Sequence, residues 1–165
     1  MAEFAIRRIT PVRFNEGYFF KTPVVDDDAD FGAGAPAHLS AGEADVAGVN
    51  DTPSEDIAGF FTAGTGDYAW KEDTFGTVVP SVPIAPANQE FRGTLLGTFA
   101  ASDVGSEYGL DTEEVDGEDI WVVDKENTGD DARVLVIAVD QEVEVGDTNV
   151  PCRFVVLPDH RQVIG

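Results

Sequence analysis

The sequence predicts an all-β fold: a single β-barrel or β-sandwich of about eight short strands, with an extended N-terminal arm and one short helix. Runs of β-branched and aromatic residues recur along the chain, bounded by Gly, Pro, Asp or Asn, as in short strands joined by turns. The 17 glycines and 9 prolines interrupt the chain often. No window longer than about ten residues keeps apolar positions at the three-to-four spacing of an amphipathic helix.

The chain of 165 residues is long enough for one domain with its own apolar core. We assign residues 1–21 to an N-terminal arm and first strand, and residues 22–165 to a β domain containing an acidic loop at residues 25–43. Residues 1–10 are expected to form the arm, whereas residues 12–21 fit either the arm or the first strand of the sheet. The loop is predicted because Ala, Gly and Asp are too frequent there to supply much core.

The predicted strands follow the arm in order. They cover residues 13–21, 44–49, 57–63, 77–85, 90–100, 119–124, 132–139, 141–146 and 152–157. Pro80 and Pro83 cannot donate to a central ladder, so the fourth of these runs is expected at an edge. Apolar residues fill nearly every position of residues 132–139, which predicts a strand buried on both faces. The short helix is predicted at residues 101–108, where Ser102 can cap its start and Gly109 can end it.

The formal net charge of −22 comes from 32 acidic and 10 basic residues. Binding a nucleic-acid backbone needs a cationic face, so this charge argues against nucleic acid as a partner. Only three of the basic residues are lysines, a composition that resembles proteins of salt-loving archaea. At about 1 M salt the Debye length falls to about 3 Å, so a dense acidic surface is screened and stays hydrated. We therefore expect that the protein works in an extremely halophilic organism.

The N-terminal arm is an exception to this acidity. Residues 1–21 hold Arg7, Arg8, Arg13 and Lys21 against Glu3 and Glu16, a net charge of +2, so the other 144 residues carry −24. Aromatic and arginine side chains are the usual anchors of protein interfaces. The candidate partner-binding residues are Arg7, Arg8, Arg13, Phe14, Tyr18, Phe19 and, near a polar loop further along, Trp70. We expect residues 1–13 to serve docking and not folding.

No pattern predicts a metal or cofactor site. The acidic run at residues 26–30 could attract a hard cation, but a calcium-loop template started at its first residue puts Phe31 where glycine must turn the chain. Gly32, Gly34 and Ala37 match a dinucleotide fingerprint in spacing, but that site requires a strand before them and a helix after them, and neither is predicted.

No pattern predicts a catalytic residue either. Nucleophilic catalysis needs a base beside the nucleophile, and His38 and His160 are expected to be ordinary surface residues. The single Cys152 stands in a strand-like stretch and is expected to be buried and inert. Trp121 is expected to pack in the sheet. Arginines near the start of the chain interrupt its apolar residues, so we expect neither a signal peptide nor a membrane span.

Five segments of the C-terminal half follow a recognisable order: an extended segment, a short capped turn, a tryptophan strand and two closing strands. They are residues 91–95 (FRGTL), 103–110 (DVGSEYGL), 121–125 (WVVDK), 133–136 (RVLV) and 153–156 (RFVV). In this the chain resembles small head proteins of tailed viruses, the decoration or minor capsid proteins. The likeness spans about 40% of the chain. The N-terminal half is similar to such proteins more loosely.

The resemblance implies a structural virion protein without enzymatic activity or cofactor. Its expected partner is the major capsid protein, and it is expected to form a small homo-oligomer, with a trimer favoured. It would be made in the host cytoplasm and sit on the outer capsid surface, with neither nucleic acid nor membrane as a partner. Two alternatives stay open: another virion component, such as a tail, neck or turret base, and an acidic module that binds carbohydrate or a cell surface.

Overall fold

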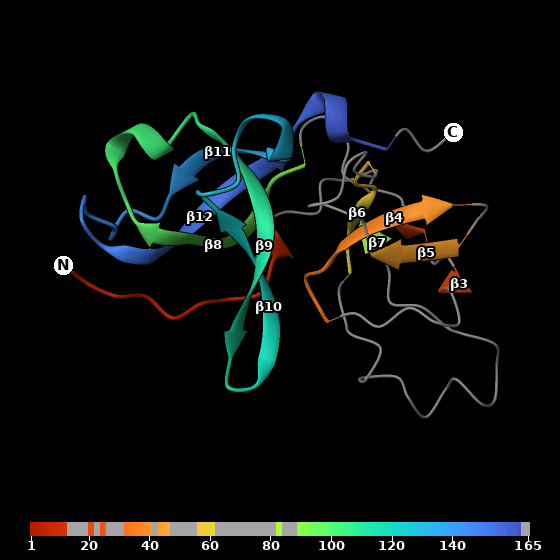
Figure 1. The fold of residues 1–165 in the computed structure, drawn as a ribbon, viewed down its shortest axis with the longest axis horizontal. Helices are drawn as coiled ribbons and strands as arrows, with labels where there is room; N and C mark the ends of the chain where they lie inside the picture. Colours follow the sequence, from red (N-terminus) through yellow and green to blue (C-terminus); the bar gives the residue numbers. More distant parts are fainter. Residues whose placement is uncertain are drawn as a thin grey trace.

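In the computed structural model, the described residues are 1–12, 20–21, 24–25, 32–40, 43–46, 56–61, 82–83 and 89–162. Strands dominate this part of the chain (Figure 1), which confirms the predicted all-β fold. The strands are β1 (Thr10–Pro11), β2 (Phe20–Lys21), β3 (Val24–Val25), β4 (Pro36–Ser40), β5 (Glu43–Val46), β6 (Gly59–Phe60), β7 (Val82–Pro83), β8 (Phe91–Thr98), β9 (Glu107–Val115), β10 (Glu118–Asp124), β11 (Val134–Val139) and β12 (Thr148–Val156). The same described residues include three single turns of 3-10 helix, η2 (Ala101–Asp103), η3 (Gly129–Asp131) and η4 (Pro158–His160).

Five strands of the C-terminal part close into a barrel. Their order around it is β8-β10-β9-β11-β12, and β12 pairs back onto β8. Neighbouring strands are antiparallel except β8 and β10, which run parallel and pair at Leu95 and Val123. Because this parallel contact is so short, β8 and β10 diverge toward their first residues. β1 occupies the edge of β8 there, with Thr10 opposite Arg92 and Pro11 opposite Phe91.

The longest hairpin of the barrel joins β9 to β10. Its turn residues Asp116 and Gly117 have φ values of 54° and 84°, and Val115 pairs with Glu118 on either side of them. Two successive residues with positive φ form the turn that matches the twist of a two-residue hairpin, and Asp-Gly is a favoured sequence for it.

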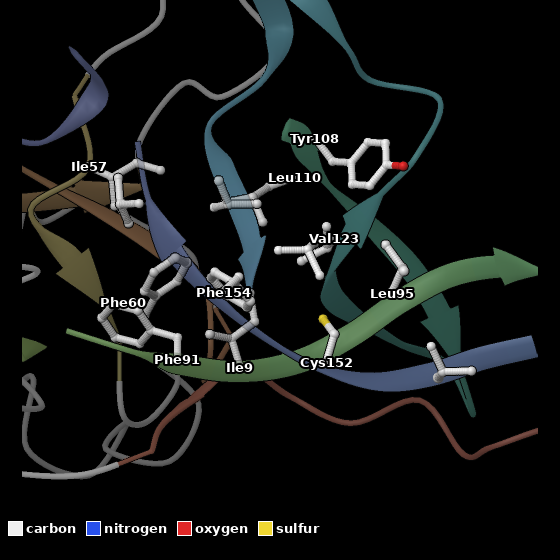
Figure 2. Close-up of a cluster of buried hydrophobic side chains, with 14 of the residues drawn as sticks. Ile9, Ile57, Phe60, Phe91, Leu95, Tyr108, Leu110, Val123, Cys152 and Phe154 are labelled. Carbon is white, nitrogen blue, oxygen red and sulfur yellow. The ribbon is translucent and has the colours of Figure 1, made fainter. Parts of the chain in front are cut away.

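The barrel interior is filled by aliphatic and aromatic side chains that converge from its strands (Figure 2). The rings of Phe60, Phe91 and Phe154 lie together at one end, with centroids 4.6 Å apart for Phe60 and Phe91 and 6.0 Å apart for Phe91 and Phe154. Phe60 comes from β6, outside the barrel. Burial of such rings contributes both area and edge-to-face contacts.

Two small sheets lie beside the barrel (Figure 1), with the orders β3-β5-β4-β6 and β2-β7. The segment that carries β6 ties the larger of them to the end of the barrel chain. The Ile57 amide donates to the His160 carbonyl at 2.8 Å, and the Gln162 amide donates to the Ile57 carbonyl at 3.0 Å. Ile57 and Phe60 are both buried in the barrel core, so the sheet and the barrel share one apolar cluster.

The sequence-predicted strands at residues 90–100, 119–124, 132–139 and 152–157 are confirmed as β8, β10, β11 and β12. β11 is not buried on both faces, however. Val134 and Val136 are buried, whereas the residues between and after them are half-buried, so the strand has one inward face. The predicted strand at residues 141–146 is wrong, because turns and irregular backbone replace it.

The predicted helix at residues 101–108 shrinks to the single turn η2, and β9 already begins at Glu107. The predicted loop at residues 25–43 also differs from the structure, because β4 occupies its last part and pairs with both β5 and β6. Ala35 and Ala37 are fully buried there, so their small side chains let neighbouring backbone approach closely. The acidic run at residues 26–30 lies outside the described residues.

Candidate partner-binding site

The N-terminal segment, residues 1–12, lies along the barrel (red in Figure 1). The Phe4 amide donates to the Thr148 carbonyl at 3.0 Å, and the Thr148 amide donates to the Ala2 carbonyl at 2.9 Å. The Ala2 amide donates to Asp147 Oδ1 at 2.5 Å, and this bond, with a second from the Glu144 amide, lowers the pKa of Asp147. The start of the segment is therefore fixed to the end of the barrel where β12 begins.

The middle of the segment is fixed to β8. The Arg7 amide donates to the hydroxyl of Thr94 at 2.9 Å, and Thr94 is buried. Ile9 inserts into the barrel core and is 3% exposed. A Cβ at Gly93 would lie 3.1 Å from Ile9 Cγ1, and one at Gly34 would lie 2.9 Å from the Ile9 amide nitrogen, so both glycines make room for this crossing. The segment is extended, as predicted, but it packs on its own barrel instead of projecting from it.

A pocket of about 460 Å³ opens between this segment and the diverging starts of β8 and β10. Its walls come from the N-terminal segment and from three barrel strands. The lining residues are Ile6, Arg7, Arg8, Thr10, Arg92, Gly93, Ile120 and Pro151. We name it the arginine pocket. Three of its lining residues are cationic, in a chain whose net charge is −22.

Two of the three arginines are held by carboxylates. Arg8 Nη2 lies 2.5 Å from Glu118 Oε2, and both side chains are largely exposed. Arg92 pairs with Asp140 across the barrel surface, with 43% of the arginine side chain exposed. No described residue makes a side-chain hydrogen bond or ion pair with the Arg7 guanidinium. Three cations facing two carboxylates leave the pocket with a net charge of about +1.

Arg92 also lies beside a second arginine. It stands directly opposite Arg153 on β12, and Arg153 Nη1 lies 3.3 Å from Glu90 Oε2. Like charges that face one another across two strands repel, and here each is offset by its own carboxylate. Arg153 does not line the arginine pocket, although its exposure of 42% is close to that of Arg92.

The structure places only part of the sequence-predicted site. Arg7 and Arg8 lie in one pocket, as neighbours on the N-terminal segment. Arg13, Phe14, Tyr18, Phe19 and Trp70 lie outside the described residues. Sequence reasoning missed the barrel side of the pocket, which is Arg92, Gly93, Ile120 and Pro151. Arg92 alone carried a signal, because an arginine within an apolar strand of so acidic a chain calls for a partner or a role.

A second polar cluster lies where β8 leaves the barrel. Asp103, in η2, accepts hydrogen bonds from the Tyr108 hydroxyl at 2.8 Å, the Lys125 ammonium at 2.7 Å and the Ala100 amide at 2.8 Å. Lys125 also donates to the Thr98 carbonyl at 2.6 Å. Burial raises the pKa of Asp103, but these bonds outweigh burial and hold it below the ordinary value. The cluster links β8, β9 and β10, so we assign it a structural role.

The remaining candidates of the sequence fall into ordinary roles. Cys152 is fully buried, as predicted, and burial raises the pKa of its thiol to about 12. His38 Nδ1 lies 2.9 Å from the Asp56 carbonyl at the surface. The glycines at 32 and 34 lead into β4, a strand and not a helix. Trp121 is half-buried against the core cluster, in line with sheet packing.

Among the described residues no group of three or more His, Cys, Asp and Glu side chains is placed to hold a metal ion. Within the same part of the chain, no helix has the length and apolar character needed to cross a bilayer. Comparison of the chain with protein-family models, with curated proteins and with solved structures finds no match.

Proposed function

We propose that this protein is a structural, non-enzymatic component of a tailed-virus head that decorates the outer capsid surface and bridges subunits of the major capsid protein. The observation that carries the proposal is where the resembling segments lie. Residues 91–95, 103–110, 121–125, 133–136 and 153–156 fall on β8, β9 with the turn before it, β10, β11 and β12. The resembling segments thus include part of every strand of the closed barrel.

The geometry of the barrel suits such a task. Its interior is filled by packed side chains, so it is a rigid body, and rigid modules lose little conformational freedom on docking. The arginine pocket gives one face a cationic, partly apolar contact region on an otherwise acidic molecule. A protein that binds only the expanded shell stabilises that shell by linkage, and many weak contacts add up over a lattice.

The setting follows from the same proposal. The protein assembles as a small homo-oligomer, with a trimer favoured, and works in a host adapted to high salt. The mass of the purified protein in concentrated salt tests the oligomer. A mass equal to one chain under those conditions would remove this part of the proposal.

Sedimentation of virus particles tests the function itself. Purified protein is expected to co-sediment with expanded heads and not with unexpanded precursors, and image reconstruction of virions should locate its density on the outer shell. A protein found on tails or necks would support the alternative of another virion component. Retention on a sugar matrix with no binding to heads would support a carbohydrate-binding module, and turnover of a substrate would contradict a purely structural role.

A further inference from the structure

We propose that the arginine pocket is a binding site for an acidic peptide segment of a partner protein, with carboxylate side chains paired to Arg7, Arg8 and Arg92 and an aliphatic side chain seated against Ile6, Ile120 and Pro151. The inference deepens the proposed function, on which it rests for the identity of the partner as a capsid subunit. The chemistry of the site itself is argued from the pocket alone.

Charge selects a short carboxylate-bearing ligand. The three arginines present guanidinium groups, which bind carboxylates in fork geometry. The phosphates of a nucleic acid would also be attracted to the three arginines. The rest of the protein would repel them, however, because the chain has a net charge of −22. A short peptide with a few acidic side chains can pair with these arginines and brings far less negative charge to the rest of the acidic surface than a nucleic acid does.

The apolar walls select a peptide over a free anion. Ile120 and Pro151 are buried barrel residues whose surfaces border the pocket, and Ile6 adds a half-buried side chain from the N-terminal segment. A volume of about 460 Å³ lies within the range of sites that take several side chains or a drug-sized ligand. An inorganic anion would bind the guanidinium groups but would leave these apolar surfaces exposed to water.

The backbone around the pocket is already fixed in the free protein, whereas the ion pairs of its arginines can be exchanged for pairs with a ligand. Thr94 fixes the backbone of Arg7, and the pairing of β1 with β8 fixes Thr10 opposite Arg92. In the free protein Arg8 forms an ion pair with Glu118, and Arg92 forms one with Asp140. The Arg8–Glu118 pair is exposed, and such pairs contribute only about 0–1 kcal/mol, so a partner's carboxylate can replace Glu118 at little cost. The Arg92–Asp140 pair is less exposed, because only 23% of the Asp140 side chain is accessible, so there the ligand's carboxylate is expected to share Arg92 with Asp140.

Fluorescence anisotropy of the full-length chain tests the chemistry directly. The probe is a labelled short peptide of alternating Glu and Leu, and it is compared with peptides in which Gln replaces Glu or Ser replaces Leu. We expect both replacements to weaken binding about tenfold. Equal binding of all three peptides, or no binding of the Glu-Leu peptide, would overturn the proposal. Competition by inorganic phosphate or by single-stranded DNA as effective as the unlabelled Glu-Leu peptide would likewise overturn it, in favour of a general anion site.

Variants locate the site. Arg7→Gln removes a guanidinium that no described residue holds, so the fold should be unaffected while peptide affinity falls about tenfold. Arg92→Ala should weaken binding at least as much, and circular dichroism shows whether that variant is folded. Arg153→Ala is the matched control, since it removes an arginine of similar exposure directly beside the pocket but outside it. Its affinity should stay within about twofold of the wild type. Unchanged affinity in Arg7→Gln would place the peptide elsewhere.

Co-sedimentation with heads separates this inference from the proposed function. If the wild-type protein binds heads and Arg7→Gln binds them equally well, the pocket is not the docking site and the inference fails while the function stands. If the wild type binds the acidic peptide but is absent from particles, the proposed function fails and the peptide site remains.

Discussion

Asp103 shows how one residue can hold several elements of the barrel. Its side chain accepts three hydrogen bonds. The donors are the Ala100 amide before η2, the Tyr108 hydroxyl on β9 and the Lys125 ammonium just after β10. Asp103 is 4% exposed, so water cannot replace these partners when they are lost. The lysine in this cluster is one of only three in the chain, which ties a scarce residue type to a structural task.

Substitution of Asp103 by Asn is expected to lower the free energy of unfolding at neutral pH by about 2 kcal/mol, because the Lys125 ammonium loses its carboxylate partner and faces a neutral amide instead. The folded pKa lies below the ordinary value of 3.8, so the unfolded carboxylate takes up protons first as the pH falls. The contribution of Asp103 is therefore complete above this value and is lost as the pH falls through the lower, folded pKa. Urea unfolding of both proteins across this range measures it.

The difference between wild type and Asp103→Asn should shrink below pH 3.8 and be flat above it. Asp130→Asn is the control, because Asp130 is exposed and its side chain makes no hydrogen bond or ion pair with another described residue. That variant should match the wild type throughout. A difference for Asp103→Asn that stays constant down to the most acidic measurement would show that the carboxylate is not held below its ordinary pKa.

At the scale of elements, the N-terminal segment belongs to the folding unit. Sequence reasoning expected residues 1–13 to serve docking alone, because a basic, aromatic start on an acidic chain has the composition of an arm. Composition does not reveal that Ile9 meets Gly93 and Phe154, residues more than 80 positions away, inside the barrel core. Residues 1–12 instead pack along the barrel, with β1 as the sixth strand of its sheet, and they also form one wall of the arginine pocket.

Deletion of residues 1–9 is expected to destabilise the protein by about 3 kcal/mol or more, the cost of emptying a buried isoleucine site. Loss of the backbone partners of Thr94, Asp147 and Thr148 adds to this cost. Thermal unfolding followed by circular dichroism measures it. Ile9→Ala should reproduce most of the loss, and Ala5→Ser, at an exposed position, should reproduce none of it. A truncated chain as stable as the full one would restore the interpretation of a free arm.

The elements that the sequence predicted well are those with continuous apolar patterns. Strands β10, β11 and β12 contain runs of β-branched or aromatic residues, and β8 has apolar residues between glycines, so local composition was sufficient to predict them. β9 was missed because Tyr108 and Leu110 are the only large buried side chains of the strand, and four of its nine residues are acidic. The Asp116–Gly117 turn that follows was a usable hairpin signal. In residues 141–146 Val alternates with acidic residues as in a strand, but the structure forms turns there, and the Val143 and Asp147 amides donate to the Asp140 and Glu144 carbonyls.

The arginine pocket could not be predicted as a whole for a different reason. Its two sides are joined only because β8 and β10 diverge and β1 fills the gap, which is a property of strand order. Two of its arginines were identified from the charge of the N-terminal segment. Arg92 and Ile120 carry no local pattern that connects them to residues 6–10, since the link is tertiary.

At the scale of the whole molecule, the acidic surface repels itself. The chain has 32 acidic and 10 basic residues, and four ion pairs join the described ones. In the β9–β10 hairpin, Glu114 and Asp119 even stand directly opposite one another. Like charges in such cross-strand pairs destabilise a sheet. Screening should relieve this repulsion, since the Debye length shortens from about 10 Å at 0.1 M salt to about 3 Å at 1 M.

The proposal of a salt-loving host therefore predicts that stability rises with potassium chloride. The midpoint of thermal unfolding should increase from dilute buffer to molar salt, and most of the rise should come while the Debye length is still longer than the spacing of surface charges. The double variant Glu114→Gln with Asp119→Asn removes one facing pair, so it should be more stable than the wild type in dilute buffer and should gain less from added salt. Equal stability of the wild type in dilute buffer and in molar salt would contradict a halophilic origin for the charge, and the acidity would then have to be explained by what the protein binds.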